Sequence, residues 1–264
     1  MDWAKNVFVR NAELYQLVLE GMWERGEEDA VAIASHLTKE GLKGCRILDV
    51  PCGIGRLAIP LARLGFEVTG VDLSPRLVGA AKRKADVFKL TAGRAKFVVG
   101  DMRELGSMFP RSSFDAVLNV FTSIGYGREE DDLSFFRDAR AVTRKGGSLL
   151  FSGLRNRDYI ARNPSQNVYE ENDKLLVLDN YTFDPSRSRE KGMWRFYLRR
   201  GGKSGEVLRY AGEFPVDIRV YSPQELVSRL EASGWSVKET FESFITRSPC
   251  RADCPIYAVA AKAA

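Results

Sequence analysis

Three aspartates in the first half of the sequence stand at the ends of short apolar runs. Asp49 closes the run in "RILDV", Asp72 closes "EVTGVD", and Asp101 closes "KFVVGD". A carboxylate can pair with an ammonium group, accept hydrogen bonds from hydroxyl groups, or take part in acid–base chemistry. One such acid could be an ordinary helix N-cap, but three in series favour a ligand site.

The residues after Asp49 form a glycine turn, "DVPCGIGR". Gly53 and Gly55 would let backbone N–H groups face a ligand at short range, whereas a tight strand–helix turn without a ligand is the alternative. Pro51 fixes φ near about −65° and has no N–H, so it fits only where neither a positive φ nor a donor is needed. It also favours extended geometry at Val50, as expected for the end of a strand.

Strand-like and helical stretches alternate between about residues 46 and 154. This repeated alternation is typical of a parallel sheet covered by helices on both faces. The carboxyl ends of parallel strands lie at one edge of the sheet, where ligands bind. The three aspartates and the glycine turn are therefore expected to meet at that edge.

The pattern divides the chain into four segments. We predict an N-terminal helical lid, a ligand-binding core, an antiparallel β insertion and a C-terminal part that completes the core sheet, at residues 1–44, 45–154, 155–221 and 222–264. Gly21 and Gly26 indicate a break between the N-terminal helices. Ser222, followed by Pro and by Glu225 at the third helical position, predicts a capped helix start.

The composition excludes several classes of protein. Of the 264 residues 44% are apolar and 28% charged, which is ordinary for a soluble globular chain. No apolar run approaches the roughly 20 residues of a membrane span, and the N-terminus has no signal-peptide layout, so we expect a cytoplasmic protein without membrane contact. The net charge of +5 permits a nucleic-acid partner but does not require one. Four cysteines and His36 give only one spaced ligand pair, Cys250 and Cys254, whereas a zinc site normally needs four ligands in such pairs. We expect Cys250 and Cys254 to be free thiols, with a local disulfide as the alternative.

On these residues the sequence resembles the class I S-adenosylmethionine-dependent methyltransferases, closely over about 45–154 and loosely over 222–262. The resemblance implies an α/β Rossmann-like fold, with a mostly parallel seven-stranded sheet, helices on both faces, and S-adenosyl-L-methionine as cofactor. It places Asp49 near the methionine part of the cofactor, Asp72 on the ribose and Asp101 near the adenine amino group. The implied cofactor-binding residues are Asp49, Pro51, Cys52, Gly53, Gly55, Arg56, Asp72, Leu73, Asp101, Met102 and Asn119. Pro51 departs from the family pattern, because it replaces the first glycine of the turn.

Two other functions are weighed against this one. A nicotinamide-dependent dehydrogenase fits "GIGRLA", which satisfies the G-x-G-x-x-A pattern. Asp49 and Asp101 count against it, because a pyrophosphate at the helix start would gain nothing from Asp49. A non-catalytic subunit with a remnant pocket should lack the cofactor acids, and all three are present.

The methyl acceptor is less constrained by the sequence. Methyl transfer needs alignment more than an acid–base pair, and a chain with one histidine favours an amine or an already acidic acceptor. Candidate catalytic residues are Asn119 and Tyr126, in "NVFTSIGYG", and Tyr15 in the predicted lid. The aromatic residues and arginines of the insertion, Arg195 and Arg219 among them, favour a small flat or anionic acceptor over RNA, which stays an alternative. Either a monomer or a homodimer is compatible with the sequence.

Overall fold

The computed structural model describes residues 2–90, 94–121, 123–163, 167–202 and 205–263. Its larger sheet has seven strands in the order β10-β11-β5-β4-β1-β2-β3. The strands are β1 Arg46–Asp49, β2 Glu67–Asp72, β3 Ala95–Val99, β4 Phe114–Val120, β5 Thr143–Leu154, β10 Ser236–Phe241 and β11 Ile256–Ala261. The first five run parallel, and β11 lies antiparallel to both β5 and β10. The predicted fold class is therefore confirmed.

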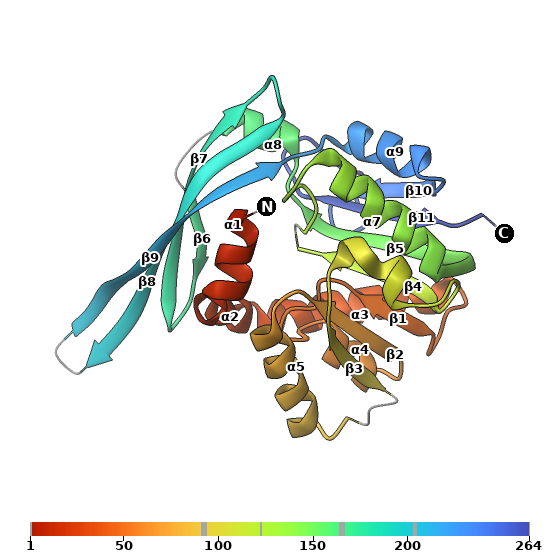
Figure 1. Ribbon diagram of the computed structural model, residues 1–264, viewed down its shortest axis with the longest axis horizontal. Helices are drawn as coiled ribbons and strands as arrows, with labels where there is room; N and C mark the ends of the chain where they lie inside the picture. Colours follow the sequence, from red (N-terminus) through yellow and green to blue (C-terminus); the bar gives the residue numbers. More distant parts are fainter. Residues whose placement is uncertain (1, 91–93, 122, 164–166, 203–204, 264) are drawn as a thin grey trace.

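Helices cover both faces of this sheet because its strands bury side chains in both directions. On one face lie α3 Trp23–Lys39, α4 Ala58–Arg63 and α5 Pro75–Val87, and on the other α6 Leu105–Met108, α7 Glu129–Val142 and α9 Pro223–Ala232 (Figure 1). The neighbours Ile47 and Leu48 are both fully buried, yet they belong to the hydrophobic clusters of opposite faces. The alternation of side chains along a strand accounts for this arrangement. Two short helices, η2 Met102–Glu104 and α8 Arg157–Arg162, complete the core connections.

The insertion forms a second, antiparallel sheet in the order β6-β7-β8-β9. Its strands are β6 Asn167–Glu171, β7 Leu175–Asp184, β8 Arg189–Gly202 and β9 Gly205–Arg219. The strand β9 is long and continues through Pro215. The connection between β8 and β9 includes Lys203 and Ser204, which lie outside the described residues.

The N-terminal helices α1 Asp2–Lys5, η1 Asn6–Arg10 and α2 Ala12–Gly21 lie between the two sheets (Figure 1). Leu14 and Val18 of α2 share a hydrophobic cluster with Leu77 of α5 and Trp194 of β8. The predicted break at Gly26 is wrong, because Gly26 lies inside α3. A Cβ there would stand 2.7 Å from the carbonyl oxygen of Arg56. Glycine thus lets α3 approach the turn after β1.

The C-terminal segment bears out the predicted cap. Ser222 Oγ accepts a hydrogen bond from the Glu225 N–H at 3.2 Å, and the Glu225 carboxylate accepts one from the Ser222 N–H at 3.0 Å. The loop between β10 and β11 carries Cys250 and Cys254 as free thiols. Within the described part of the chain, no helix is both long enough and apolar enough to cross a membrane.

Candidate functional site

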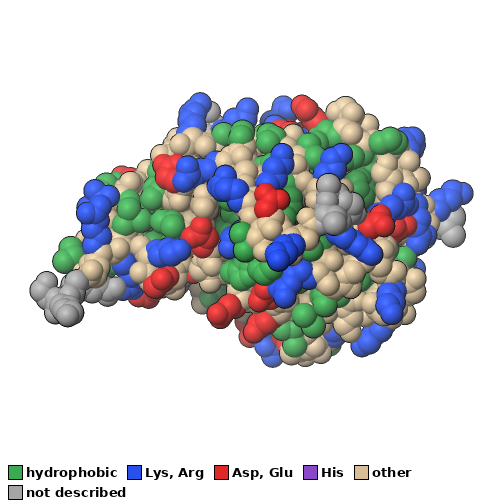
Figure 2. Space-filling view, turned by 90° about the horizontal axis from the view of Figure 1, so that it is seen from below, with side chains coloured by type: hydrophobic (Ala, Val, Ile, Leu, Met, Phe, Trp, Pro, Cys, Tyr) green, Lys and Arg blue, Asp and Glu red, His purple; other side chains and the backbone are tan. Residues whose placement is uncertain are grey.

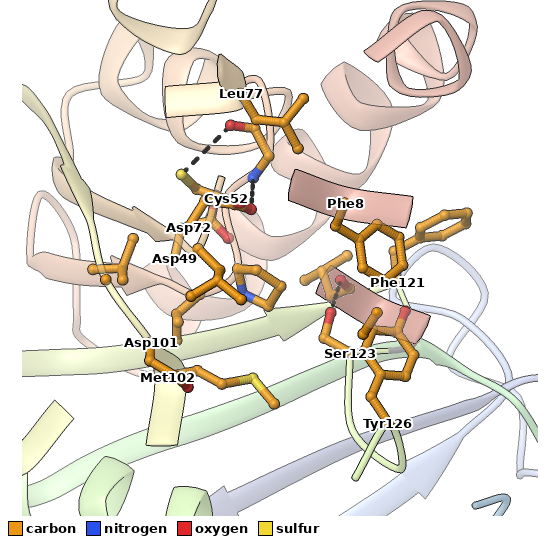
Figure 3. A pocket seen from close by; sticks show the side chains of 18 of the residues that line it. Phe8, Asp49, Cys52, Asp72, Leu77, Asp101, Met102, Phe121, Ser123 and Tyr126 are labelled. Atoms are coloured by element: carbon orange, nitrogen blue, oxygen red, sulfur yellow. Dashed lines mark hydrogen bonds between the residues drawn. The ribbon is translucent and has the colours of Figure 1, made fainter. Parts of the chain in front are cut away.

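The carboxyl ends of β1, β2, β3 and β4 border a cavity that α1, η1 and α2 cover; we name it the inner cavity. Most of the predicted cofactor-binding residues line it: Asp49, Pro51, Cys52, Gly53, Arg56, Asp72, Leu73, Asp101 and Met102. Tyr15, Ser123 and Tyr126 line it as well, whereas Gly55 and Asn119 are not among its lining residues. Figure 3 shows the acids on one side of the cavity and Phe8 and Tyr126 on the other.

Gly53 and Gly55 of the glycine turn are glycines for different structural reasons. Gly53 has φ +53°, and a Cβ there would stand 2.8 Å from Leu19 of α2, so its glycine allows the helix to close over the turn. Gly55 has φ +79°, and a Cβ there would meet Ile59 at 3.0 Å, so it serves packing beneath the cavity. The peptide bond between Val50 and Pro51 is cis.

Asp49 is a buried acid that has no hydrogen-bond partner among the described residues. Its residue is 1% exposed, and neither carboxylate oxygen accepts a hydrogen bond from the described residues. Burial raises its pKa to about 7, although the positive charge of the Arg56 guanidinium lowers it in part. A buried carboxylate in this condition is stabilised by any cation that reaches it.

The other two acids are held in place by hydrogen bonds. Asp72 accepts the N–H groups of Gly53 and Ser74, both at 2.9 Å, while burial raises its pKa to about 6. Asp101 is paired with Arg103, with its Oδ1 2.9 Å from the guanidinium Nε. Burial would raise the pKa of Asp101, but the hydrogen bonds from Arg103 outweigh burial, so its pKa is lowered.

Asn119 lies under the turn rather than in the cavity. Its amide Nδ2 donates to the Val50 carbonyl oxygen at 2.9 Å, and the side chain is fully buried. A direct contact of Asn119 with a ligand is therefore not supported, and its place is that of a support for the turn. Cys52 does line the cavity, but burial raises its thiol pKa well above the ordinary value, so it is a poor nucleophile.

The side of the cavity opposite the acids is an aromatic wall. In this wall Phe8, Tyr15 and Tyr126 line the cavity, and Trp3, Tyr169 and Trp194 pack behind them. Phe8 lies 4.6 Å from Tyr15 and 5.3 Å from Tyr126, measured between ring centroids. Burial raises the pKa of Tyr15 and Tyr126, so both hydroxyl groups are neutral near pH 7.

Several of these residues were missed by the sequence analysis. Helical periodicity in the N-terminal segment was the available signal for Phe8 and Leu19, but it could not say what the buried face packs against. Asp132 was missed as well. It lines the cavity and accepts the Gly125 N–H at 2.9 Å and the Tyr221 hydroxyl at 2.7 Å, which fixes the loop after β4. The predicted segment there includes Thr122, which lies outside the described residues.

The prediction that Arg195 and Arg219 contact the acceptor is not supported. Arg195 pairs with Glu213 at 3.0 Å and stays partly exposed. Arg219 pairs with Glu225 at 3.0 Å and lies over the Tyr221 ring. Neither arginine is among the lining residues of the inner cavity. Local acids neutralise both, and the sequence did not indicate these pairings.

Sequence comparison matches residues 47–147 to a family model described as a methyltransferase domain. The chain is 38% identical over 121 residues to a protein named as a methyltransferase from Geobacillus sp., covering 45% of this chain and 47% of that one. It is 32% identical over 112 residues to a ubiquinone biosynthesis O-methyltransferase from Cereibacter sphaeroides, covering 42% of each chain. The chain thus spans less than half the length of these curated relatives.

Solved structures resemble the fold over most of its length. A S-adenosylmethionine-dependent methyltransferase from Clostridium acetobutylicum has a TM-score of 0.74 at 16% identity, covering 89% of this chain and 91% of that one. An amino pentose methyltransferase of calicheamicin biosynthesis from Micromonospora echinaspora has a TM-score of 0.70 at 17% identity, covering 94% and 96%. Residues 47–147 are thus similar to a methyltransferase domain, and the fold of the chain is that of solved S-adenosylmethionine-dependent methyltransferases.

Proposed function

We propose that this chain binds S-adenosyl-L-methionine in the inner cavity and transfers its methyl group to a small-molecule acceptor. The observation that carries the proposal is the carboxylate of Asp49, which is buried beside the glycine turn and accepts no hydrogen bond from the described part of the chain. A ligand with an ammonium group would pair with this carboxylate, and the amino acid end of this cofactor carries such a group. A pyrophosphate would instead meet an uncompensated negative charge.

The remaining residues of the cavity fit the other parts of that cofactor. Asp72, oriented by the N–H groups of Gly53 and Ser74, would accept hydrogen bonds from the ribose hydroxyls. Leu73 and Met102 offer apolar surface for the adenine, and Asp101 stands near its edge. When bound, the cofactor supplies an activated methyl group.

The chain's own contribution to transfer is then positioning and exclusion of water. Phe8, Tyr15 and Tyr126 close the cavity with aromatic surface, and an aromatic face near a cation contributes attraction of ~0.5–2 kcal/mol. Among the residues that the structure describes, no lysine or histidine lines the cavity, and Tyr15 and Tyr126 remain neutral. An acceptor that needs no strong base, such as an amine or an acidic hydroxyl, therefore suits the site.

A small molecule is favoured over RNA by two observations. The relatives named above include enzymes of ubiquinone and amino pentose methylation, which act on small molecules by their names. On the face in Figure 2, Lys and Arg side chains are interspersed with Asp and Glu and form no continuous basic track. Strand-binding proteins combine such a track with stacking aromatic residues.

Calorimetry with S-adenosylhomocysteine and with NAD tests the proposal directly. We expect S-adenosylhomocysteine to bind and NAD to bind weakly or not at all; binding of NAD alone would reject the proposal. Transfer of a labelled methyl group to fractionated lysate then identifies the acceptor class. Label in RNA but not in small molecules would support the RNA alternative, and binding without any transfer would support a non-catalytic subunit.

A further inference from the structure

A second cavity adjoins the inner cavity and opens to solvent; we name it the outer cavity. Its lining residues are Trp3, Arg103, Tyr126, Gly127, Arg128, Asp131, Arg189 and Asp217. Four of them, Arg103, Tyr126, Gly127 and Asp131, also line the inner cavity. The two spaces therefore share a wall. At about 470 Å³, the outer cavity is within the roughly 300–1,000 Å³ typical of small-molecule sites.

Aromatic contacts hold Tyr126 of the shared wall in place. Trp3 Nε1 donates to the Tyr126 carbonyl oxygen at 3.3 Å, and the Trp3 and Tyr126 rings lie 4.9 Å apart. Phe8 stacks on the inner side of Tyr126. A flat acceptor that lies against Tyr126 would have one end toward the inner cavity and the other toward the charged rim of the outer one.

The rim carries three guanidinium groups and two carboxylates. Arg103 is engaged by Asp101 and lies 3.6 Å from Asp131. Arg189 is engaged by Asp217, whose Oδ1 lies 2.5 Å from Nε, and by the Gly127 carbonyl oxygen.

Arg128 differs from both, since it is exposed and forms no ion pair with any residue that the structure describes. It is thus a cation available to a ligand, next to the fixed cation of Arg189.

We infer that the outer cavity is the acceptor site, and that it takes a small molecule with a flat apolar body and a carboxylate or phosphate group, which Arg128 binds. The inference rests on the proposed function, because the inner cavity must hold the methyl donor. Arg128, which lines the outer cavity beside the inner one, would then bind the acceptor in place of Arg195 and Arg219. Anions prefer guanidinium groups because charge-assisted hydrogen bonds are stronger than neutral ones.

Four probes built on the same ring test the charge preference: benzoate, phenyl phosphate, benzamide and benzylamine. Their binding is measured by ligand-observed NMR titration with S-adenosylhomocysteine present. We expect benzoate and phenyl phosphate to bind, and benzamide and benzylamine to bind at least tenfold more weakly. The comparison of benzoate with phenyl phosphate shows which anionic group the site prefers. Equal binding of all four, a preference for benzylamine, or binding of none overturns the inference.

Variants of opposite expected sign locate the site. Arg128→Gln should weaken binding of the preferred anion about five- to tenfold, and Asp217→Asn should strengthen it, since the rim then loses a competing carboxylate. Arg137→Gln, on the helix α7 that Arg128 precedes as N-cap but outside both cavities, is the matched control and should change nothing. If Arg128→Gln behaves like Arg137→Gln, the anion binds elsewhere and the inference fails. Calorimetry with S-adenosylhomocysteine separates the two hypotheses: its failure rejects the proposed function, whereas intact cofactor binding without anion binding rejects the acceptor site alone.

Discussion

Replacement of Asp49 by Asn should stabilise the free protein while it weakens cofactor binding. The pKa of Asp49 is about 7 in the folded state, against an ordinary value near 3.8. Between about pH 4 and pH 7 the folded state therefore keeps a proton that the unfolded chain has released, so the free energy of unfolding falls as pH rises through this window. The cost levels off above pH 7, at a ceiling of about 4 kcal/mol.

Chemical denaturation of the free protein at two pH values measures this cost. At pH 8.5 we expect Asp49→Asn to raise the free energy of unfolding by about 2 kcal/mol, and at pH 4.5 to change it little. Asp115→Asn is the control of opposite sign. Burial would raise the pKa of Asp115, but its hydrogen bonds with Arg46 and Arg144 outweigh burial, so its pKa is lowered and its loss should destabilise.

Calorimetry with S-adenosylhomocysteine measures the other half of the prediction. A charge-assisted hydrogen bond is worth about 1.5–3 kcal/mol, so Asp49→Asn should lower the affinity about 10- to 100-fold at pH 7.5. The wild-type affinity should fall as pH drops below 7, because the carboxyl becomes neutral, by up to about tenfold per pH unit. The variant should lack this pH dependence. A variant with wild-type affinity and unchanged stability at pH 8.5 would refute the role given to Asp49.

Substitutions at three further positions test the surroundings of the site. Gly53→Ala should lower the free energy of unfolding by about 1–2 kcal/mol and loosen the lid, because its Cβ would meet Leu19 at a positive φ. Urea denaturation measures the loss, and unchanged stability would contradict the packing argument. Tyr15→Phe should lower the free energy of unfolding by about 1 kcal/mol, since Tyr169 loses its hydroxyl partner, and should leave the affinity for S-adenosylhomocysteine within about threefold. Tyr15→Ala should weaken that affinity further. Equal affinities of the two variants would argue against a contact of the Tyr15 ring with the ligand. Arg195→Ala should leave the KM for the acceptor unchanged and change the free energy of unfolding by no more than about 0.5 kcal/mol, because Arg195 forms only an exposed ion pair. A raised KM would restore Arg195 as an acceptor contact.

The core and its acids could be predicted because they depend on short-range patterns. Asp49, Asp72 and Asp101 follow apolar runs of strand length, and the parallel topology brings the ends of such strands to one edge. The glycine turn could be predicted for the same reason, since a positive φ at Gly53 leaves a residue-type signal. The end of β4 was placed well, but Asn119 holds the Val50 carbonyl instead of lining the cavity, and no local pattern distinguishes these roles.

Contacts between segments far apart in the sequence could not be predicted. Gly26 looked like a helix break, yet it is the point at which α3 touches the backbone of Arg56. Arg195 and Arg219 looked like acceptor contacts, yet each has an acid partner: a cross-strand neighbour for the first and a helix-cap residue for the second. A charged side chain in a sequence does not disclose whether it is already neutralised. Arg195 is neutralised because the register of β8 and β9 places Glu213 opposite it.

The position of α2 links the two sheets to one site. Leu19 touches the glycine turn, Tyr15 lines the inner cavity, and the same helix shares its hydrophobic cluster with Trp194 of the second sheet. A cofactor that fills the inner cavity would contact this helix, and the aromatic wall beyond it includes Trp3 and Tyr126, which border the outer cavity. Order imposed on the N-terminal helices by the first ligand need not be imposed again by the second. We therefore expect the acceptor to bind better after the cofactor, and the unpartnered charge of Asp49 to be neutralised in that first step.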